Sequence, residues 1–388
     1  MVMLMLATSF SFVSCSDDDD DAPKSYQLQI NLNLQDGMTA ENISDLSVVL
    51  TNDKGIEQTI TLSGTSATVE TLQGMYTLTA SGKVKDEAAA YATGKASVDL
   101  FADATVTIDV TKIYQSPLIY KSIYTTGGKQ GYVVDQYFEI VNNSDEVQYL
   151  DQLILSAPTG NQTKENAWQA NGMKDLYECG QGTVLAFPGS GKDYPLNPGQ
   201  SIVLANNAVD HRELAGEGNA CPDLSKADWE VYIDNVQGEI DYEAPNVDII
   251  FQSNAYMKAF GLGFFGRAFI IARLPQGMTP QDFAADEKNI MTTPGTSSKM
   301  EFLMIPSKYV LDAVDIWDSL KTGHYPTFLP KDDVKGVFGS EAWAGKCVRR
   351  KVTKVENGRA YYQDTNNSAN DFLTNQPLTP GVTPTVAD

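Results

Sequence analysis

The sequence predicts an all-β protein. Runs of alternating polar and apolar residues recur along most of the chain, and turn residues separate them, among them 30 Gly and 17 Pro. One short stretch, DEAAAYATG (residues 86–94), favours a helical turn instead. With 388 residues the chain is long enough for two or three domains, each with a hydrophobic core of its own.

The first fifteen residues, MVMLMLATSFSFVSC, form an apolar run that is too short to remain as a membrane span. Ser14 precedes Cys15 and a polar segment follows, which is the layout of a secretory signal that ends at a lipid-modified cysteine. No Lys or Arg precedes the apolar run, so the true start codon stays open. We expect residues 1–15 to be the signal with its anchor, Cys15.

Residues 16–24 begin with the acidic run SDDDDD, which is typical of a solvated linker. Cys15 followed by Ser16 and an acidic run also resembles the export signal that sends lipoproteins of Bacteroidota to the cell surface. The resemblance implies a protein that is lipid-anchored in the outer membrane and exposed on the cell surface.

The formal net charge of −22 argues against a nucleic-acid partner, because a phosphate-binding surface needs an excess of Lys and Arg. The same charge argues against direct attraction to an anionic membrane. We therefore expect no nucleic acid among the partners, and contact with the membrane through the N-terminal lipid only.

Residues 25–112 are predicted to form a first β-sandwich. YQLQINLNL alternates polar and apolar side chains from Tyr26 to Leu34, as a half-buried strand does. Further strands are expected at 46–52, 58–64, 66–72, 75–84 and 104–113. LQGMYTLTASG (72–82) resembles the last turn and strand of carboxypeptidase-regulatory or transthyretin-like sandwiches, and this resemblance implies a spacer domain.

Residues 113–388 are predicted to form a second, larger β-domain. Its clearest strands are expected at 119–127, 135–144, 148–157, 200–208, 267–274 and 308–316. Long polar stretches separate these strands, and we interpret them as inserts near 157–195 and 206–300. Connections of that length are often functional or carry local structure of their own.

Several segments of this region resemble the lamin-tail domain, an immunoglobulin-like β-sandwich. They are IYKSIYTTGG, DQYFEIVNNSDEVQYLDQLIL, YPLNPGQSIVLAN, YVLDAVDI and DTNNSANDFLTNQPLTPG. Longer segments, such as AFPGSGKDYPLNPGQSIVLANNAVDH and FLMIPSKYVLDAVDI, resemble an uncharacterised family of Bacteroidota surface lipoproteins, a domain of unknown function. Members often sit beside genes for TonB-dependent outer-membrane transport, which implies a role in uptake.

Three cysteines follow the anchor. An oxidising compartment favours one disulfide, and we predict Cys179 with Cys221 because both lie in neighbouring loop-like stretches. Such a bond would stabilise the fold by about 4 kcal/mol on the chain-entropy account. Cys347 lies in a strand-like run and is interpreted as a small buried apolar residue.

The segment from Asp364 places side-chain oxygens on alternate residues, as at the start of a calcium loop. Ala369 stands where that loop needs Gly, and Asn375 stands where it needs a bidentate Glu. We therefore expect turns that close the fold, with calcium as the alternative. PGSGK (188–192) likewise lacks the frame of a phosphate loop and is interpreted as a turn.

We expect no enzyme, no catalytic residue, no metal site and no cofactor. The chain has two histidines, His211 and His324, and contains neither a Gly-x-Ser-x-Gly elbow nor a Cys-x-x-Cys pair. A hydrolase would need a carboxylate pair that the fold brings together, which a sequence alone cannot show.

Candidate contact residues are Trp168, Trp229, Trp343 and His211, because they lie in polar stretches between strands. The aromatic segment 256–274 is interpreted as core, with an exposed patch as the alternative. We expect a binding or accessory component of an outer-membrane TonB-dependent uptake system, which works with a transporter barrel and takes a glycan or protein ligand. The alternative is an adhesive or structural surface protein that recognises proteins or polysaccharide.

Overall fold

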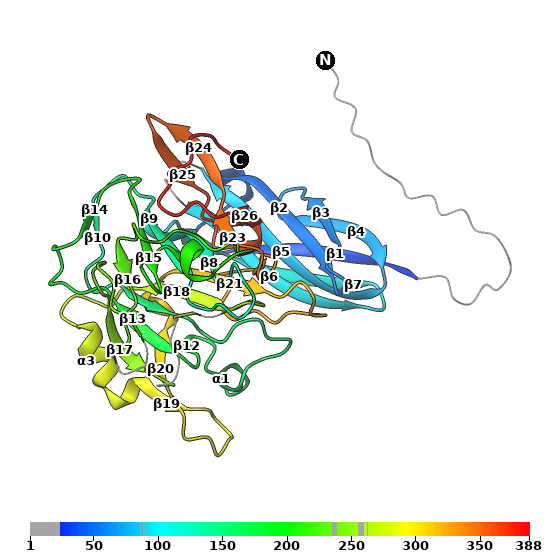
Figure 1. Cartoon of the computed structure of the whole chain (residues 1–388). Helices are drawn as coiled ribbons and strands as arrows, with labels where there is room; N and C mark the ends of the chain where they lie inside the picture. The colour runs from blue at the N-terminus through cyan, green and yellow to red at the C-terminus, as the bar shows by residue number, and fades with distance from the viewer. Residues whose placement is uncertain (1–23, 86, 88–89, 235–238, 255–259, 262) are drawn as a thin grey trace.

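The computed structural model describes residues 24–85, 87, 90–234, 239–254, 260–261 and 263–388 (Figure 1). The signal, Cys15 and nearly all of the acidic linker lie outside this part of the chain. The described residues are mostly β, which confirms the predicted fold class. Helices in the described ranges are short: α1 (Ala167–Ala170), α2 (His211–Leu214), α3 (Pro280–Ala285), α4 (Ser368–Asp371) and the 3-10 turns η1 (Ala40–Asn42), η2 (Glu287–Asn289) and η3 (Ser307–Tyr309). Within these ranges no helix has the length and apolar character that a membrane crossing requires.

The N-terminal unit is one seven-stranded sheet around one core. Its strands are β1 (Ser25–Leu34), β2 (Ile43–Asn52), β3 (Glu57–Thr61), β4 (Ser66–Leu72), β5 (Gly74–Val84), β6 (Ala90–Leu100) and β7 (Ala104–Tyr114), in the order β3-β2-β5-β6-β7-β1-β4. β1 buries Leu28, Ile30 and Leu32 while the residues between them face outward, as the alternation predicts. The edge strands β3 and β4 contact each other, so the sheet curls around its core.

The helical turn predicted for residues 86–94 is wrong over residues 90–94, because these residues form the start of β6. Ala90 and Ala92 are fully buried there, and a Cβ on Gly94 would lie 2.3 Å from the Asp109 carbonyl oxygen of β7. Small residues let β6 approach its neighbours closely. Pairing on both sides therefore overrides the helix propensity of alanine.

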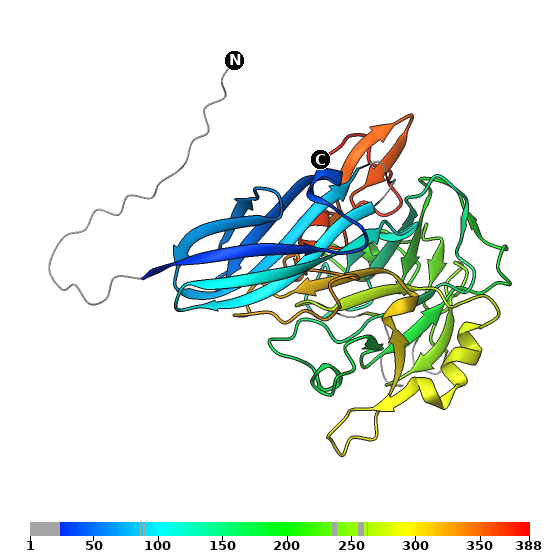
Figure 2. The ribbon, with the colours of Figure 1, turned by 180° about the vertical axis from the view of Figure 1, so that it is seen from behind.

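Several strands of the N-terminal unit begin or end where the chain enters this unit. β1 starts where β4 ends, since Ser25 pairs with Leu72, and β6 ends beside the start of β5, since Gly74 pairs with Leu100. We call this the tether end, because residue 24 leads into it. Figures 1 and 2 show β1 (dark blue) beginning at the end of this unit that lies farthest from the other strands of the protein.

The C-terminal unit, residues 118–388, is a β-sandwich of two six-stranded sheets. One sheet contains β16 (Trp229–Glu230), β15 (Ser201–Ala205), β9 (Tyr137–Asn142), β8 (Leu118–Tyr124), β23 (Lys346–Arg350) and β26 (Phe372–Pro377). The other contains β17 (Asp248–Gln252), β13 (Thr183–Ala186), β11 (Ile154–Ser156), β18 (Ala268–Ala272), β21 (Val310–Trp317) and β22 (Val337–Phe338). Apolar side chains of both sheets meet in one core, as Phe138 and Phe269 do with ring centroids 5.4 Å apart.

The long inserts carry structure of their own. β12 (Leu176–Glu178), β20 (Glu301–Pro306) and β19 (Ile290–Thr292) form a small sheet, which packs with α1 and α3 on the outer face of the second sheet. Two short pairs complete the unit, β10 (Gln148–Tyr149) with β14 (Pro195–Leu196) and β24 (Val352–Glu356) with β25 (Arg359–Tyr362). The specific transthyretin-like and lamin-tail-like types stay predictions.

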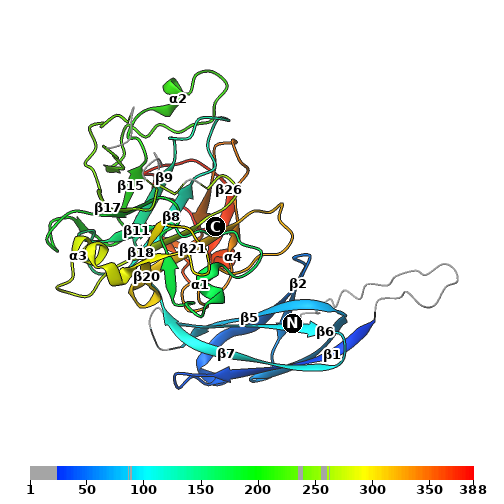
Figure 3. The ribbon, with the colours of Figure 1, turned by 90° about the horizontal axis from the view of Figure 1, so that it is seen from below.

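The two units pack side by side (Figure 3). Lys95 of β6 donates a 2.9 Å hydrogen bond to the carbonyl oxygen of Val334, and Lys335 reaches Thr51 and Glu57 on β2 and β3. Two adjacent residues of one C-terminal loop therefore contact three strands of the N-terminal unit.

Candidate functional site

Two of the predicted contact residues are buried, so the expectation that they face a ligand is wrong. Trp168 and Trp229 are 6% and 5% exposed. Trp168 packs edge-on against Phe302 in the core beneath α1, and Trp229 packs against Phe187 and Tyr194. The polar inserts fold back over the sandwich, and these tryptophans fill the space between the layers.

His211 is also wrong as a contact residue, because its side chain is fully buried at the start of α2. Its Nε2 lies 2.9 Å from the Asn207 carbonyl oxygen, which can only accept, so Nε2 carries the proton. Nδ1 then accepts from the Tyr132 hydroxyl at 2.7 Å. Burial lowers the pKa of His211, in agreement with this neutral ring.

Trp343 alone among the four predicted contact residues is half-buried. Its ring stacks on Phe264 with centroids 4.3 Å apart and planes at 27°. Phe265 follows and is 57% exposed. We call Phe264, Phe265 and Trp343 the aromatic patch.

The backbone holds the aromatic patch firmly. Trp343 has φ of 63°, a left-handed conformation that is strained for so large a side chain. Its N–H donates to the Thr126 carbonyl oxygen just beyond β8, and its ring lies so close to Gly127 that a Cβ there would be 2.8 Å away. The side-chain amide of Asn161 holds the loop that carries Phe264 and Phe265, because it donates to the Phe265 carbonyl oxygen at 2.7 Å. The neighbouring structure therefore fixes the strained conformation.

The aromatic segment 256–274 combines both interpretations. Phe260 and all five residues of β18 are buried, as the core interpretation requires. Phe265, between Gly263 and Gly266, reaches solvent instead. Residues 256–259 and 262 lie outside the described part of the chain. Sequence reasoning named Trp343 but not the pairing with Phe264, because the two rings come from segments that are far apart in the sequence.

A buried charge network crosses the sandwich at β8. Arg350 on β23 is 1% exposed and donates to both oxygens of Asp312 on β21 at 2.8 Å. It also donates to Asp364 at 3.0 Å and to the Tyr120 carbonyl oxygen at 2.8 Å. Burial raises the pKa of Asp364 to about 7, and the positive charge of Arg350 opposes that rise.

The residues of the calcium-like segment point to separate partners. Asp364 pairs with Arg350, Ser368 donates to Asp333 through its hydroxyl at 2.7 Å, and Asn366 donates to the Lys331 carbonyl oxygen. Across the described ranges, no group of three or more His, Cys, Asp or Glu side chains could hold a metal ion. The segment fastens the C-terminal strand to the sandwich, as the fold-closing interpretation predicts.

The PGSGK turn binds a carboxylate of the protein itself. The N–H groups of Gly191, Asp193 and Tyr194 donate to the buried Asp151 carboxylate at 2.7 to 2.8 Å. These backbone hydrogen bonds hold the pKa of Asp151 below its usual value despite the opposing effect of burial. A Cβ on Gly189 would lie 2.4 Å from the same carboxylate. The interpretation of this stretch as a turn is confirmed.

Comparison with known proteins identifies the region that holds the aromatic patch and the Arg350 network. Residues 197–379 match the family described as a protein of unknown function (DUF4876). A solved DUF4876 family protein from Bacteroides thetaiotaomicron VPI-5482 is 26% identical, with a TM-score of 0.62, over 93% of this chain and 99% of that one. The expected resemblance to an uncharacterised Bacteroidota family is confirmed.

Two other solved structures are less similar to this protein. A DUF3823 family protein from Parabacteroides merdae ATCC 43184 is 14% identical with a TM-score of 0.18, over 36% of this chain and 67% of that one. The fimbrial anchor protein Mfa2 from Porphyromonas gingivalis is 13% identical with a TM-score of 0.17, over 35% and 61%. Scores this low carry no argument here. No curated protein matches the sequence significantly.

The predicted disulfide is wrong, because the three described cysteines are all free and buried. Cys179 lies in the outer core beside β20, where its sulfur accepts from the Leu303 N–H. Cys221 lies in a different core cluster, next to Gly128 beyond β8. Cys347 is 2% exposed, as predicted for a small buried residue.

Proposed function

We propose that this protein is a cell-surface lipoprotein, anchored through Cys15, that binds a partner through the aromatic patch as an accessory component of an outer-membrane uptake system. The observation that supports the binding role is the patch itself. It places Phe265 in solvent beside the stacked Phe264 and Trp343, on loops tied to β8.

Such a surface suits recognition for two physical reasons. Aromatic rings give a large contact area and lose little conformational entropy on binding, since each has two rotatable bonds. Loops held by a rigid β-framework keep those rings in place before the partner arrives, which lowers the ordering cost of association. The strained backbone of Trp343 fits this role, because strain of this kind is concentrated at functional sites.

The surface location and the uptake role rest on the N-terminal segment and on family resemblance. Cys15, Ser16 and the acidic run resemble a surface-export signal. Similar lipoproteins are often encoded beside TonB-dependent transporters, so the proposed partner is a transporter barrel.

A pull-down from gently solubilised outer membranes tests the proposal. The acylated wild-type protein is compared with Phe265→Ala and with Phe338→Ala, the matched control at an aromatic residue that is 47% exposed elsewhere on the same unit. We expect one transporter barrel to be recovered in near-equal amount with the wild type and with Phe338→Ala, and to be largely lost with Phe265→Ala.

The other outcomes are equally informative. If Phe265→Ala still recovers the barrel, the aromatic patch is not part of the interface. Recovery of no barrel would overturn the uptake role and favour the adhesive one, which a glycan and matrix-protein array would then examine.

A further inference from the structure

The tether end of the N-terminal unit carries a cluster of exposed apolar side chains. Leu72, Met75 and Phe101 are 49%, 54% and 60% exposed. Leu72 pairs with Ser25 at the start of β1, Met75 is the second residue of β5, and Phe101 directly follows β6. We call these three residues the tether-end patch. Ile56, in the turn after β2, is exposed at the same end, because Asn52 pairs with Tyr76 near the start of β5.

Exposed apolar residues are unevenly distributed over this unit. The structure describes five large ones between residues 24 and 114, and four of these lie at the tether end. The fifth, Tyr114, donates its hydroxyl to Glu87. Single exposed apolar residues are normal on a protein surface, whereas a cluster on one end indicates a contact surface.

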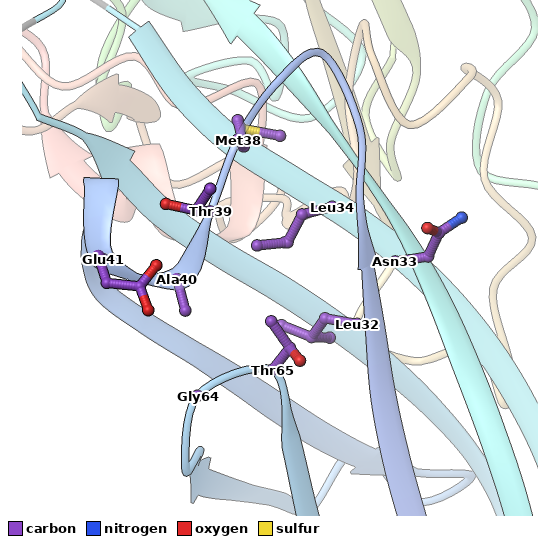
Figure 4. A pocket seen from close by; sticks show the side chains of 9 residues that line it. All are labelled: Leu32, Asn33, Leu34, Met38, Thr39, Ala40, Glu41, Gly64 and Thr65. Carbon is purple, nitrogen blue, oxygen red and sulfur yellow. The ribbon is translucent and has the colours of Figure 1, made fainter.

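The opposite end of the unit is built differently. It contains a hollow of about 360 Å³ between the end of β1, η1 and the β3–β4 turn (Figure 4). Of its large apolar lining residues, Leu32 and Met38 are buried, at 7% and 5% exposure, and Leu34 is half-buried. The exposed apolar character is therefore specific to the end that residue 24 enters.

We propose that the tether-end patch rests on the lipid bilayer. This inference depends on the proposed lipid anchor at Cys15. Lys24 lies nine positions after Cys15, and even a fully extended chain of that length spans only about 30 Å. The anchor therefore keeps the tether end close to the lipid at all times.

The shape of the molecule agrees with this placement. In Figures 1 and 3 the tether end projects beyond the C-terminal unit, so it can reach a flat surface before the larger unit does. Leu, Met and Phe side chains partition into the boundary between headgroups and acyl chains, and they add a second membrane signal to the lipid. With the tether end on the bilayer, β7 leads the chain away from the lipid toward the C-terminal unit.

Depth measurement on vesicles tests the inference. The acylated full chain, with Gln73→Cys, is labelled with an environment-sensitive fluorophore and bound to vesicles of phosphatidylethanolamine and phosphatidylglycerol that contain nitroxide-labelled lipid. Gln73 is exposed at the centre of the tether-end patch, and the native thiols that the structure describes are buried and escape labelling in the folded protein. Thr65→Cys, exposed at the opposite end, is the matched control.

We expect severalfold stronger quenching at position 73 than at position 65. Adding Met75→Ser and Phe101→Ser to Gln73→Cys should remove most of that quenching. The urea midpoint should not change, since both side chains are exposed. Equal quenching at the two positions, or quenching that survives the two serines, would overturn the inference. Energy transfer between labelled copies without lipid quenching would assign the surface to a second copy and also overturn it.

The mass of the peptide that contains Cys15 distinguishes a failure of the proposed lipid anchor from a failure of the membrane placement alone. A peptide without acyl chains would overturn both the lipoprotein assignment and the placement of the tether-end patch. An acylated peptide together with an unquenched label at position 73 would overturn the placement alone.

Discussion

Arg350 and Asp312 join the two sheets of the sandwich through a buried ion pair, in which one guanidinium nitrogen donates to both carboxylate oxygens at 2.8 Å. The Tyr120 N–H donates to the same carboxylate at 2.7 Å, and Arg350 donates back to the Tyr120 carbonyl oxygen. Side chains from β21 and β23 thus meet at the backbone of β8.

Replacing Arg350 with alanine should destabilise the protein by about 3–5 kcal/mol, because Asp312 and Asp364 would be left buried without a positive charge. Urea unfolding measures the loss. Arg349→Ala is the matched control on the same strand, since Arg349 pairs with Asp388 at a site where both side chains are partly exposed. That change should cost less than about 1 kcal/mol. Equal losses for the two variants would contradict the structural role of the buried network.

Gly189→Ala should destabilise the protein more than Gly191→Ala. Both glycines have positive φ, at 119° and 125°, so alanine costs about 1–3 kcal/mol of backbone strain at either position. At Gly189 the added Cβ would also collide with the Asp151 carboxylate, whereas nothing lies within 4 Å at Gly191. Thermal unfolding of the two variants measures the difference. A larger loss of stability for Gly191→Ala would contradict the close packing of Gly189 against the Asp151 carboxylate.

Stability should rise with pH above about 8 because of Lys95. Burial at the contact between the two units lowers the pKa of Lys95 from 10.5 to about 8. Between pH 8 and 10.5 the unfolded chain binds more protons than the folded one, so the free energy of unfolding rises with pH in this window. Below about pH 8 Lys95 is charged in both states, and the cost of burying its charge is fully present.

Urea unfolding across this pH window, compared with Lys95→Met, isolates the contribution of Lys95. The wild type should gain about 1–3 kcal/mol relative to the variant between pH 8 and 10.5. Lys83→Met, at an exposed position of β5, is the control for removing a lysine charge. Parallel curves for the wild type and Lys95→Met would show that the ammonium group is solvated in the folded protein.

The thiols of Cys179, Cys221 and Cys347 should resist alkylation in the folded protein and react after denaturation. All three are buried, and burial raises the pKa of each to about 12, so little reactive thiolate forms. Mass spectrometry of iodoacetamide-treated samples, with and without guanidinium, counts the modified positions. A mass loss of two hydrogen atoms that reduction reverses would instead show a disulfide.

Calcium should leave the unfolding temperature unchanged, because Asp364 and Ser368 are committed to Arg350 and Asp333. Differential scanning calorimetry with calcium and with a chelator checks this. A rise of the midpoint in calcium that Asp364→Asn abolishes would restore the metal interpretation.

The sequence predicted the regular part of the fold well, for physical reasons that particular strands illustrate. β1 and β7 alternate polar and apolar residues because each has one buried face, and the pattern shows this directly. β6 escaped prediction because its alanines and glycine are selected by close strand packing rather than by strand propensity. In the site, Trp343 could be named, but its contact with Phe264 joins distant segments.

Burial of the other candidates could not be predicted for the same reason. Trp168 and Trp229 stand among polar neighbours, and only the folding of the inserts over the sandwich covers them. Cys179 and Cys221 stand in neighbouring loop-like stretches of the sequence, yet Cys179 lies in the outer core and Cys221 lies next to Gly128 beyond β8. Likewise, nothing in the run CVRR distinguishes the buried Arg350 from the half-buried Arg349.

The position of β8 has a consequence for how the newly made chain folds. All seven residues of β8 are buried, and its sheet neighbours are β9, which follows soon after, and β23, which comes near the end of the chain. During synthesis one edge of β8 therefore stays open until Lys346–Arg350 have been made. An open edge invites pairing with other chains. Until its last strands are in place, the chain is thus exposed to pairing with its own copies.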